Sequence, residues 1–262
     1  MGIDPNKPSA ARIYDAFLGG THNFAADRVV ATRAVELVPD IPEIARANRA
    51  FLRRAVRFAL SRGIDQFLDL GSGIPTEGNV HEIAQAIDPG ARTAYVDVDP
   101  TAVLYARDML AADPNTVVIQ ADLQEPGTVL AAPALRDLID LSRPVAVLMI
   151  AVLHFAPDSP RLTAALRDYR AAVAPGSLLA ISHTTGSGAD PAALERIADL
   201  YNRTGTPLVL RDRAQVAGLF EGWELVEPGV VFCPQWHPDP EDPPEADPAR
   251  LLMLGGAGLA RH

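Results

Sequence analysis

Short apolar runs alternate with amphipathic segments along most of this chain. Five runs are almost continuously apolar: residues 67–70, 94–98, 116–123, 144–155 and 178–183. Apolar side chains with helical spacing follow the fourth run, at Leu162, Leu166, Tyr169 and Val173. Strands that are apolar on both faces and are separated by helices are typical of a parallel sheet covered on both sides. The pattern therefore predicts an α/β fold with a mostly parallel, Rossmann-like sheet.

The two ends of the chain depart from this alternation. An apolar stripe with helical spacing precedes the first strand, at Ile44, Ala47, Phe51, Ala55 and Phe58. Residues 251–254 predict a last strand, which we expect to be antiparallel. We therefore predict an N-terminal helical cap over residues 1–62 and a main domain over residues 63–262, folded together as one structural unit.

A glycine turn and a strand-end acid form the most informative pattern in the chain. Gly71 and Gly73 follow the first strand, and Asp97 ends the second. Glycines let the backbone approach a ligand closely, and an acid at a strand end accepts hydrogen bonds from ribose hydroxyls. Both NAD and S-adenosylmethionine (SAM) are bound by such an arrangement, while a glycine-rich turn without a ligand is the alternative.

The residues around the turn favour SAM over a dinucleotide. Thr76 stands where the dinucleotide fingerprint has its third glycine, and Pro75 removes a backbone N–H that would serve a pyrophosphate. Asp69 adds a negative charge, which repels pyrophosphate but suits the ammonium group of methionine. Asn79 and Glu82 have the spacing of a capping box, so we expect the next helix to begin late.

The chain resembles the class I SAM-dependent methyltransferases over residues 63–262. A second set of motifs extends over nearly the whole chain: ARIYDAFLGG (11–20), NFAADR (23–28), NRAFLRR (48–54), GSGIPT (71–76), GNVH (78–81) and VLHF (152–155). With these motifs the chain is more closely similar to the actinomycete SAM-dependent methyltransferase family long known only as a domain of unknown function. The resemblance implies a SAM site at the carboxyl edge of the sheet and makes Pro75 a variant of that family, but it implies no particular substrate.

We expect the cofactor to contact the strand ends and the cap. The resemblance implies that Asp122 lies near the adenine amino group and that Arg12 and Asn23 close over the methionine end. The expected cofactor-binding residues are Asp69, Gly71, Ser72, Gly73, Asp97, Val98, Asp122, Leu123, Ala151, Arg12, Tyr14, Gly20 and Asn23.

His154 is our candidate for a catalytic base, because it directly follows the fourth apolar run. A neutral imidazole can take a proton from a hydroxyl or amine acceptor at pH 7. His183, Tyr14 and Asp15 are the other candidates at this edge. The alternative is that His154 is structural and that alignment alone drives the transfer.

Polar residues are concentrated in residues 9–28, so we predict that this segment forms a lid over the cofactor. Salt bridges among these residues are the alternative. The glycines of Leu18-Gly-Gly-Thr21 suit either a hinge or a plain helix C-cap. A basic stripe at Arg46, Arg49, Arg53 and Arg57 suits either a solvated face or a site for an anionic group. From these features we expect a small anionic or polar acceptor.

The tail contains a stretch rich in proline and acids, residues 234–248, which we expect to be an exposed loop without a core. Cys233 and His237 have a spacing that metal ligands also use, but no second ligand cluster accompanies them. We therefore predict no metal site.

Composition restricts the class of protein further. The chain has 262 residues, 48% hydrophobic content and a net charge of −10, which argues against nucleic-acid or anionic-membrane partners. No run of about 18 apolar residues and no export signal is visible, and a single cysteine suits the cytoplasm. Oligomeric state cannot be derived from these patterns.

The sequence thus predicts a SAM-dependent methyltransferase that acts on a small molecule. Two alternatives stay open at this stage. One is an NAD(P)-dependent oxidoreductase, and the other is a SAM-binding regulatory protein without catalytic activity.

Overall fold

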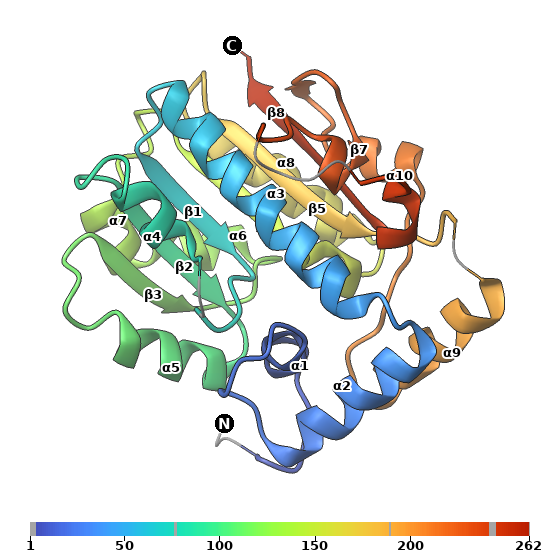
Figure 1. The fold of residues 1–262 in the computed structure, drawn as a ribbon. Coiled ribbons are helices and arrows are strands. Elements are labelled where there is room, and N and C mark those ends of the chain that lie inside the picture. Colours follow the sequence, from blue (N-terminus) through green and yellow to red (C-terminus); the bar gives the residue numbers. More distant parts are fainter. Residues whose placement is uncertain (1–3, 76–77, 189, 241–244, 262) are drawn as a thin grey trace.

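The computed structural model describes residues 4–75, 78–188, 190–240 and 245–261. Within these residues eight strands form one sheet in the order β3-β2-β1-β4-β5-β8-β6, with β7 also pairing with β8 (Figure 1). The strands are β1 Gln66–Leu70, β2 Arg92–Asp97, β3 Thr116–Gln120, β4 Ala146–Ile150, β5 Leu178–Thr184, β6 Trp223–Leu225, β7 Val231–Phe232 and β8 Met253–Ala260. Strands β1 to β5 are parallel, whereas β8 runs antiparallel to its neighbours β5, β6 and β7.

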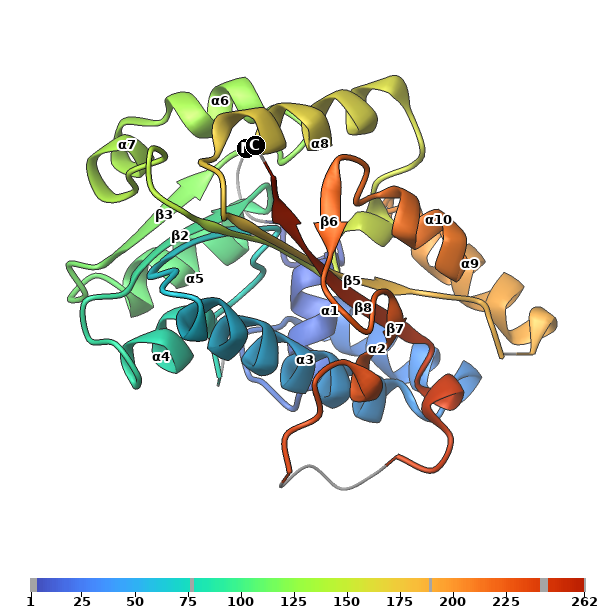
Figure 2. The same cartoon turned by 90° about the horizontal axis from the view of Figure 1, so that it is seen from above.

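Helices cover both faces of the sheet, as Figure 2 shows from above. The helices are α1 Ala10–Phe17, α2 Ala25–Leu37, α3 Ile41–Ser61, α4 Val80–Gln85, α5 Pro100–Met109, α6 Pro126–Ala131, α7 Pro133–Leu138, α8 Pro160–Ala172, α9 Pro191–Arg203 and α10 Arg213–Gly218. Helices α3 and α4 lie on one face, and α6, α7 and α8 lie on the other. The predicted α/β class with a mostly parallel sheet is therefore confirmed.

Strand side chains alternate between two separate cores. In β1, Phe67 joins the core under α3, while Leu68 joins the core under α8. In β4, Leu148 and Val147 divide in the same way. This alternation follows from the two-residue period of a strand and explains why the runs are apolar throughout.

The predicted fourth strand is too long. β4 ends at Ile150, and Ala151 adopts a left-handed φ of 53°. The Ala151 N–H donates to the Ser182 carbonyl (3.1 Å) and to its Oγ (2.9 Å). The chain then forms a short 3-10 turn, Leu153–Phe155. Apolar character alone could not locate this end, because the turn is as apolar as the strand.

The proline-rich tail contributes to the core, contrary to the sequence-based expectation. Trp236 is 0% exposed and packs edge-on against the rings of Phe51 and Phe58. Arg54, itself buried, donates to the carbonyls of Cys233 (2.7 Å) and Trp236 (2.9 Å). These bonds satisfy backbone groups that a buried loop would otherwise leave unpaired. The last strand also begins later than predicted, at Met253.

The N-terminal helices differ in position. Helix α3 packs against β4, β5 and β8, so it belongs to the layer that covers the sheet. Helices α1 and α2 lie beyond the carboxyl ends of the parallel strands, with α9 beside α2. The domain boundary between residues 62 and 63 stays a prediction. The capping box at Asn79 and Glu82 is present, and α4 begins at Val80.

Candidate functional site

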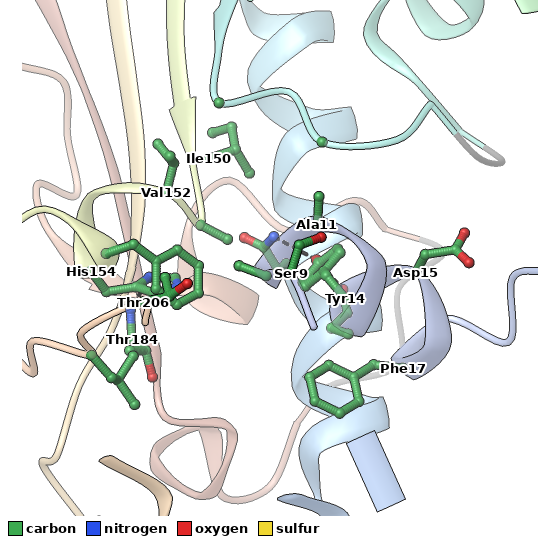
Figure 3. Close-up of a pocket in the computed structure, with 18 of the residues that line it drawn as sticks. Ser9, Ala11, Tyr14, Asp15, Phe17, Ile150, Val152, His154, Thr184 and Thr206 are labelled. Atoms are coloured by element: carbon green, nitrogen blue, oxygen red, sulfur yellow. Dashed lines mark hydrogen bonds between the residues drawn. The ribbon is translucent and has the colours of Figure 1, made fainter. Parts of the chain in front are cut away.

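A cavity of about 360 Å³ lies between the carboxyl ends of the parallel strands and helices α1, α3 and α9. One end of the cavity is lined by the turns after β1, β2 and β3, by residues 150–152 after β4 and by Arg49 beside Asp69, and we call it the strand end. The other end is lined by apolar side chains from α1, α3 and α9, by His154 and Phe155, by residues 206–210 and by the start of β8, and we call it the helix end. Figure 3 shows His154, Thr184 and Thr206 gathered on one side, with Tyr14 and Phe17 on the other.

The turn after β1 requires glycine at its first position. Gly71 has φ +76°, and a Cβ there would lie 2.2 Å from Cγ2 of Val152. The N–H groups of Gly71 and Ser72 both donate to the Val96 carbonyl, at 2.8 and 3.1 Å. Gly73 also has a positive φ, +65°, but the space around it is open, with Ala11 Cβ at 4.0 Å. The turn is therefore fixed against β2 and β4 while its outer side faces the cavity.

Asp97 holds the two turns together. One carboxylate oxygen accepts the Gly73 N–H at 2.7 Å, and the other accepts the Asp99 N–H at 2.8 Å. Burial raises the pKa of Asp97 to about 6, although these backbone hydrogen bonds lower it. The carboxylate is thus oriented before any ligand arrives.

Asp69 is a buried carboxylate that lines the cavity, with 6% of its surface exposed. Burial raises its pKa to about 7; the nearby Arg49 guanidinium lowers it and Asp97 raises it further. Across the described parts of the chain, no donor forms a hydrogen bond to this carboxylate. Buried acids are normally hydrogen-bonded, so the site fits a ligand that brings its own donor and positive charge.

The remaining predicted strand-end residues also line the cavity: Val98, Asp122, Leu123 and Ala151. Asp122 accepts the Gln124 N–H at 2.8 Å and an Arg161 guanidinium N–H at 2.9 Å. Val98 is 65% exposed, which is unusual for a valine directly after a buried strand. An exposed apolar side chain at this position suits a flat ring lying against it. Thr76, whose identity separated SAM from a dinucleotide, lies outside the described residues.

The predicted N-terminal residues divide into two groups. Tyr14 lines the cavity, whereas Arg12, Gly20 and Asn23 do not. Arg12 Nε donates to Asp27 at 2.8 Å, and Arg12 Nη1 donates to Thr101 at 3.0 Å. Arg12 was expected to contact the cofactor directly. Its guanidinium is instead buried and joins Asp27 to Thr101 within the protein.

Asn23 and Gly20 likewise lie beside the Asp15 carboxylate and not at the cavity. The Asn23 amide donates to the Asp15 carboxylate at 2.7 Å and to the Gly20 carbonyl at 2.8 Å. A Cβ at Gly20 would lie 2.0 Å from that carboxylate. The His22 N–H donates to Asp15 as well, at 2.9 Å. Bonding among the polar residues, the alternative left open above, is what the structure shows for this group.

Helix α1 is tied to the sheet through a chain of polar side chains. The Tyr14 hydroxyl donates to the Ala45 carbonyl (3.2 Å) and accepts from the Asn48 amide (2.8 Å). The Asn48 side-chain oxygen accepts the Ser182 hydroxyl, which in turn accepts the Ala151 N–H. The Tyr14 pKa is raised, chiefly by burial. The hydroxyl is therefore a neutral structural group at physiological pH.

His154 lies on the 3-10 turn after β4 and lines the cavity. Burial lowers its pKa well below the ordinary value, and His183 and Arg211 lower it further. The Thr184 N–H points at its Nδ1 from 3.5 Å, so a proton on Nδ1 would face another donor. This contact favours the neutral tautomer that carries its proton on Nε2.

Arg211 is a site-supporting residue that the sequence analysis missed. It is 1% exposed, and its guanidinium donates to the Leu153 carbonyl at 2.9 Å and to His183 Nε2 at 2.7 Å. It also donates to the Ala156 carbonyl (2.8 Å) and the Asp158 carboxylate (2.6 Å). His183, another candidate base, is thereby occupied, and it does not line the cavity. No local pattern marks Arg211, because its partners lie far away in the sequence.

The basic stripe on α3 serves two purposes. Arg53 and Arg57 both pair with Asp239, at 3.4 and 3.3 Å, on a partly exposed surface. Arg49 lines the cavity and donates to the Asn79 side chain at 3.2 Å. The solvated-face interpretation therefore suits Arg53 and Arg57, and Arg49 contributes positive charge beside Asp69.

Comparison with known proteins agrees with this geometry. The sequence profile of the S-adenosyl methyltransferase family matches residues 1–262. A predicted methyltransferase from Thermobifida fusca has 41% identity and a TM-score of 0.90, covering 98% of this chain and 96% of its own. A DUF574 family protein from Streptomyces avermitilis has 38% identity and a TM-score of 0.92, covering 99% and 100%. No functionally curated protein matches the sequence.

More distant structures share the fold. The N-methyltransferase NodS from Bradyrhizobium japonicum, in complex with S-adenosylhomocysteine (SAH), has 15% identity and a TM-score of 0.51, covering 84% of this chain and 88% of its own. Within the described residues, no helix has both the length and the apolar character needed to cross a membrane.

Proposed function

This chain belongs to the S-adenosyl methyltransferase family, and we propose that it transfers the methyl group of SAM to a small organic molecule bound at the helix end of its cavity. It is a SAM-dependent methyltransferase by family and by fold. The identity of the acceptor and the roles of individual residues are the proposed part.

The observation that carries the proposal is the Asp69 carboxylate, buried at the cavity wall without a hydrogen-bond donor from the described protein. We propose that it accepts the ammonium group of the methionine moiety. Asp97, held by Gly73 and Asp99, accepts the ribose hydroxyls. Val98, Leu123 and Asp122 surround the adenine, and Ser72, Ala151 and Tyr14 complete the walls. Arg12, Gly20 and Asn23 act indirectly by holding α1 in place.

When bound, SAM supplies a methyl group on a sulfonium: a lone pair of the acceptor forms the new bond to the methyl carbon, the C–S bond breaks with its electron pair on sulfur, SAH leaves, and any proton on the acceptor atom passes to bulk solvent. Such a displacement needs chiefly alignment of the two reactants. We propose that α1 and the turn after β4 provide it, because they close the cavity from opposite sides and are linked through Tyr14 and Asn48. The cap, residues 9–28, also covers the cofactor and excludes water from it during the transfer.

For His154 we propose a donor role in place of the base role expected from the sequence. Its Nε2–H can donate to a polar atom of the acceptor next to the reacting atom, which orients the acceptor and leaves the reacting lone pair free. A ring whose pKa lies well below 6.5 is a weak base at pH 7, since proton transfer is most effective when the pKa is near the working pH. The two roles differ in a measurable way, because a base would give a rate that falls with acid through its own pKa.

We also propose that the protein acts on a small molecule and that it is cytoplasmic. The acidic chain, with its net charge of −10, suits a small-molecule acceptor better than a nucleic acid. The single cysteine, Cys233, is buried and suits a cytoplasmic protein. The family match gives no support to an oxidoreductase or to a regulator without catalytic activity.

Calorimetric titration with SAM, SAH and NADH tests the cofactor site. SAH and SAM should bind and NADH should not. Asp69→Asn should weaken SAH binding by about tenfold to a hundredfold, because a hydrogen bond to a charged group contributes about 1.5–3 kcal/mol. Asp65→Asn is the matched control, since Asp65 lies just before β1 at its opposite end and pairs with Arg143 on the surface. Absence of SAH binding to the wild-type protein would refute the proposal.

A further inference from the structure

We infer that the acceptor is a neutral, mostly apolar molecule with an aromatic ring and that it presents one polar atom to the His154 side of the cavity. The inference rests on the proposed function for its premise that the strand end holds the methyl donor. It replaces the anionic acceptor expected from the sequence.

The helix end is apolar in composition. Its walls come from helices and loops that are distant in sequence, and most of the side chains are apolar. Representative residues are Phe17, Ile41, Phe155, Ile197, Leu208 and Met253. A ligand pocket with such walls gains affinity from apolar surface and uses a few polar groups for orientation.

Most polar groups at the helix end are already hydrogen-bonded within the protein. The Tyr14 hydroxyl and both ends of the Asn48 amide belong to the chain that reaches Ser182. The Thr184 hydroxyl donates to the Leu252 carbonyl at 3.2 Å. A strongly polar acceptor would therefore leave its own groups unpaired after losing its water, which disfavours its binding.

A small set of polar atoms is left for the ligand. Among the described residues that line the helix end, His154 Nε2, the Thr206 hydroxyl and the Tyr201 hydroxyl have no protein partner, and Asp15 Oδ1 is also unpaired. Figure 3 shows His154 and Thr206 on the same side of the cavity. One polar atom on the acceptor is enough to use this cluster, and its position then directs the adjacent reacting atom toward the strand end.

The charges around the cavity disfavour an anionic acceptor. The acids that line the cavity are Asp15, Asp69, Asp97, Asp99 and Asp122, and the basic residue of the described lining is Arg49. Arg53 and Arg57, which were candidates for holding an anion, pair with Asp239 instead. Arg49 lies near Asp69, at the strand end. Among the described lining residues, an anionic acceptor would therefore find no cation at the helix end, and acids outnumber the one arginine over the whole cavity.

Aromatic side chains form the cavity wall beside His154, and they favour an acceptor that contains an aromatic ring. The rings of Phe155 and Tyr201 lie 5.7 Å apart with an interplanar angle of 33°, and the His154 ring lies 4.3 Å from Phe155. Aromatic side chains favour offset-stacked or edge-on contacts with another ring, which gives a flat ligand a preferred orientation here.

The test compares two probes that share a ring system, neutral 2-naphthol and the anion 2-naphthoate. Each is titrated calorimetrically into the protein saturated with SAH. We expect 2-naphthol to bind at least about tenfold more tightly, and we expect Leu208→Arg to reverse this preference by placing a cation in the apolar wall. SAH affinity should stay within about threefold of the wild type in this variant. Val29→Arg, on an exposed part of α2, is the matched control and should change neither probe.

The outcomes separate this inference from the proposed function. Equal or tighter binding of 2-naphthoate to the wild type would overturn the inference, and so would SAH binding with no binding of 2-naphthol. If Leu208→Arg failed to fold, Phe155→Ala would take its place, with weaker 2-naphthol binding expected and unchanged binding contradicting the inference. Binding of 2-naphthol to a protein that does not bind SAH would uphold the apolar site while refuting the proposed function.

Discussion

The two ends of the cavity are built in different ways. At the strand end, backbone groups and acids from the turns after β1 and β2 hold one another, as in the hydrogen bonds from Gly73 and Asp99 to Asp97. At the helix end, apolar side chains converge from α1, α3, α9 and the loop before α10. The first arrangement recognises charge and hydrogen bonds at fixed positions, and the second recognises shape.

This difference indicates which part of the cavity can change its specificity during evolution. The strand-end groups are fixed by the sheet, so a substitution there disturbs the fold and the cofactor together. The helix-end side chains come from separate elements, and each can change without altering the sheet. We therefore expect relatives with one cofactor site to accept different acceptors. The predictions below test this division, beginning with the largest expected effect.

Arg211→Met tests whether the support of the helix end is structural. The change leaves the carbonyls of Leu153 and Ala156 and the Nε2 of His183 without a donor. Each buried polar group left unpaired costs about 1–3 kcal/mol, so we expect a loss of about 3–5 kcal/mol of unfolding free energy. Thermal unfolding measures it, with Asp158→Asn as control because the Asp158 side chain is 68% exposed. An equal loss in both variants would contradict the assignment to the buried carbonyls.

Gly71→Ala tests the rigidity of the strand end. A Cβ would lie 2.2 Å from Val152, in a backbone conformation that suits glycine. Strain and overpacking each cost about 1–3 kcal/mol, so SAH affinity should fall by about a hundredfold or more. Gly73→Ala is the matched control, since it has a similar φ but open space. We expect the Gly73 variant to bind more tightly than the Gly71 variant, and the reverse order would show that the clash with Val152 is relieved.

The pH dependence should differ between SAH affinity and stability. Burial raises the pKa of Asp69 to about 7, and an ammonium ligand requires the ionised carboxylate. SAH affinity should therefore rise with pH up to about 7, by close to tenfold per pH unit below that value. Because the folded pKa lies above the unfolded value, Asp69 contributes stability at low pH that is lost as pH rises through about 7.

Calorimetry and thermal unfolding of the SAH-free protein between pH 5 and 8 measure these two slopes. Asp69→Asn should reduce both slopes relative to the wild type, because it removes one of the two titrating carboxylates and leaves Asp97, whose pKa is about 6. The stability difference between the two proteins isolates Asp69 from the other titrating residues. A variant whose SAH affinity keeps the wild-type pH dependence would show that another group titrates in this range.

Arg57→Gln should have the smallest effect, because it changes the solvated face and neither end of the cavity. The Arg57 side chain is 53% exposed and shares Asp239 with Arg53. Exposed pairs contribute about 0–1 kcal/mol, so the melting temperature should shift by only a few degrees at most. SAH and 2-naphthol should bind as in the wild type. A marked loss of either would place this face in the binding machinery.

The sequence alone was enough to predict the parts whose signals are local. Continuous apolar runs indicated the parallel strands, and the spacing of Asn79 and Glu82 located the start of α4. The glycine turn and Asp97 could be assigned to one edge because parallel strands end there together. These features depend on residues close in the chain or on the period of a strand, and both are visible without coordinates.

Tertiary structure decided the parts that depend on contacts between distant residues. Arg12 was expected at the cofactor, but Asp27 and Thr101 occupy its guanidinium. Trp236 belongs to a proline-rich segment, yet it is buried because Phe51, Phe58 and Arg54 provide a site for it. The proton position on His154 depends on the Thr184 N–H, and the acceptor end depends on helices that meet only in the fold. Side-chain partners of this kind are selected by packing across the whole chain, and no local pattern records which partner each residue finds.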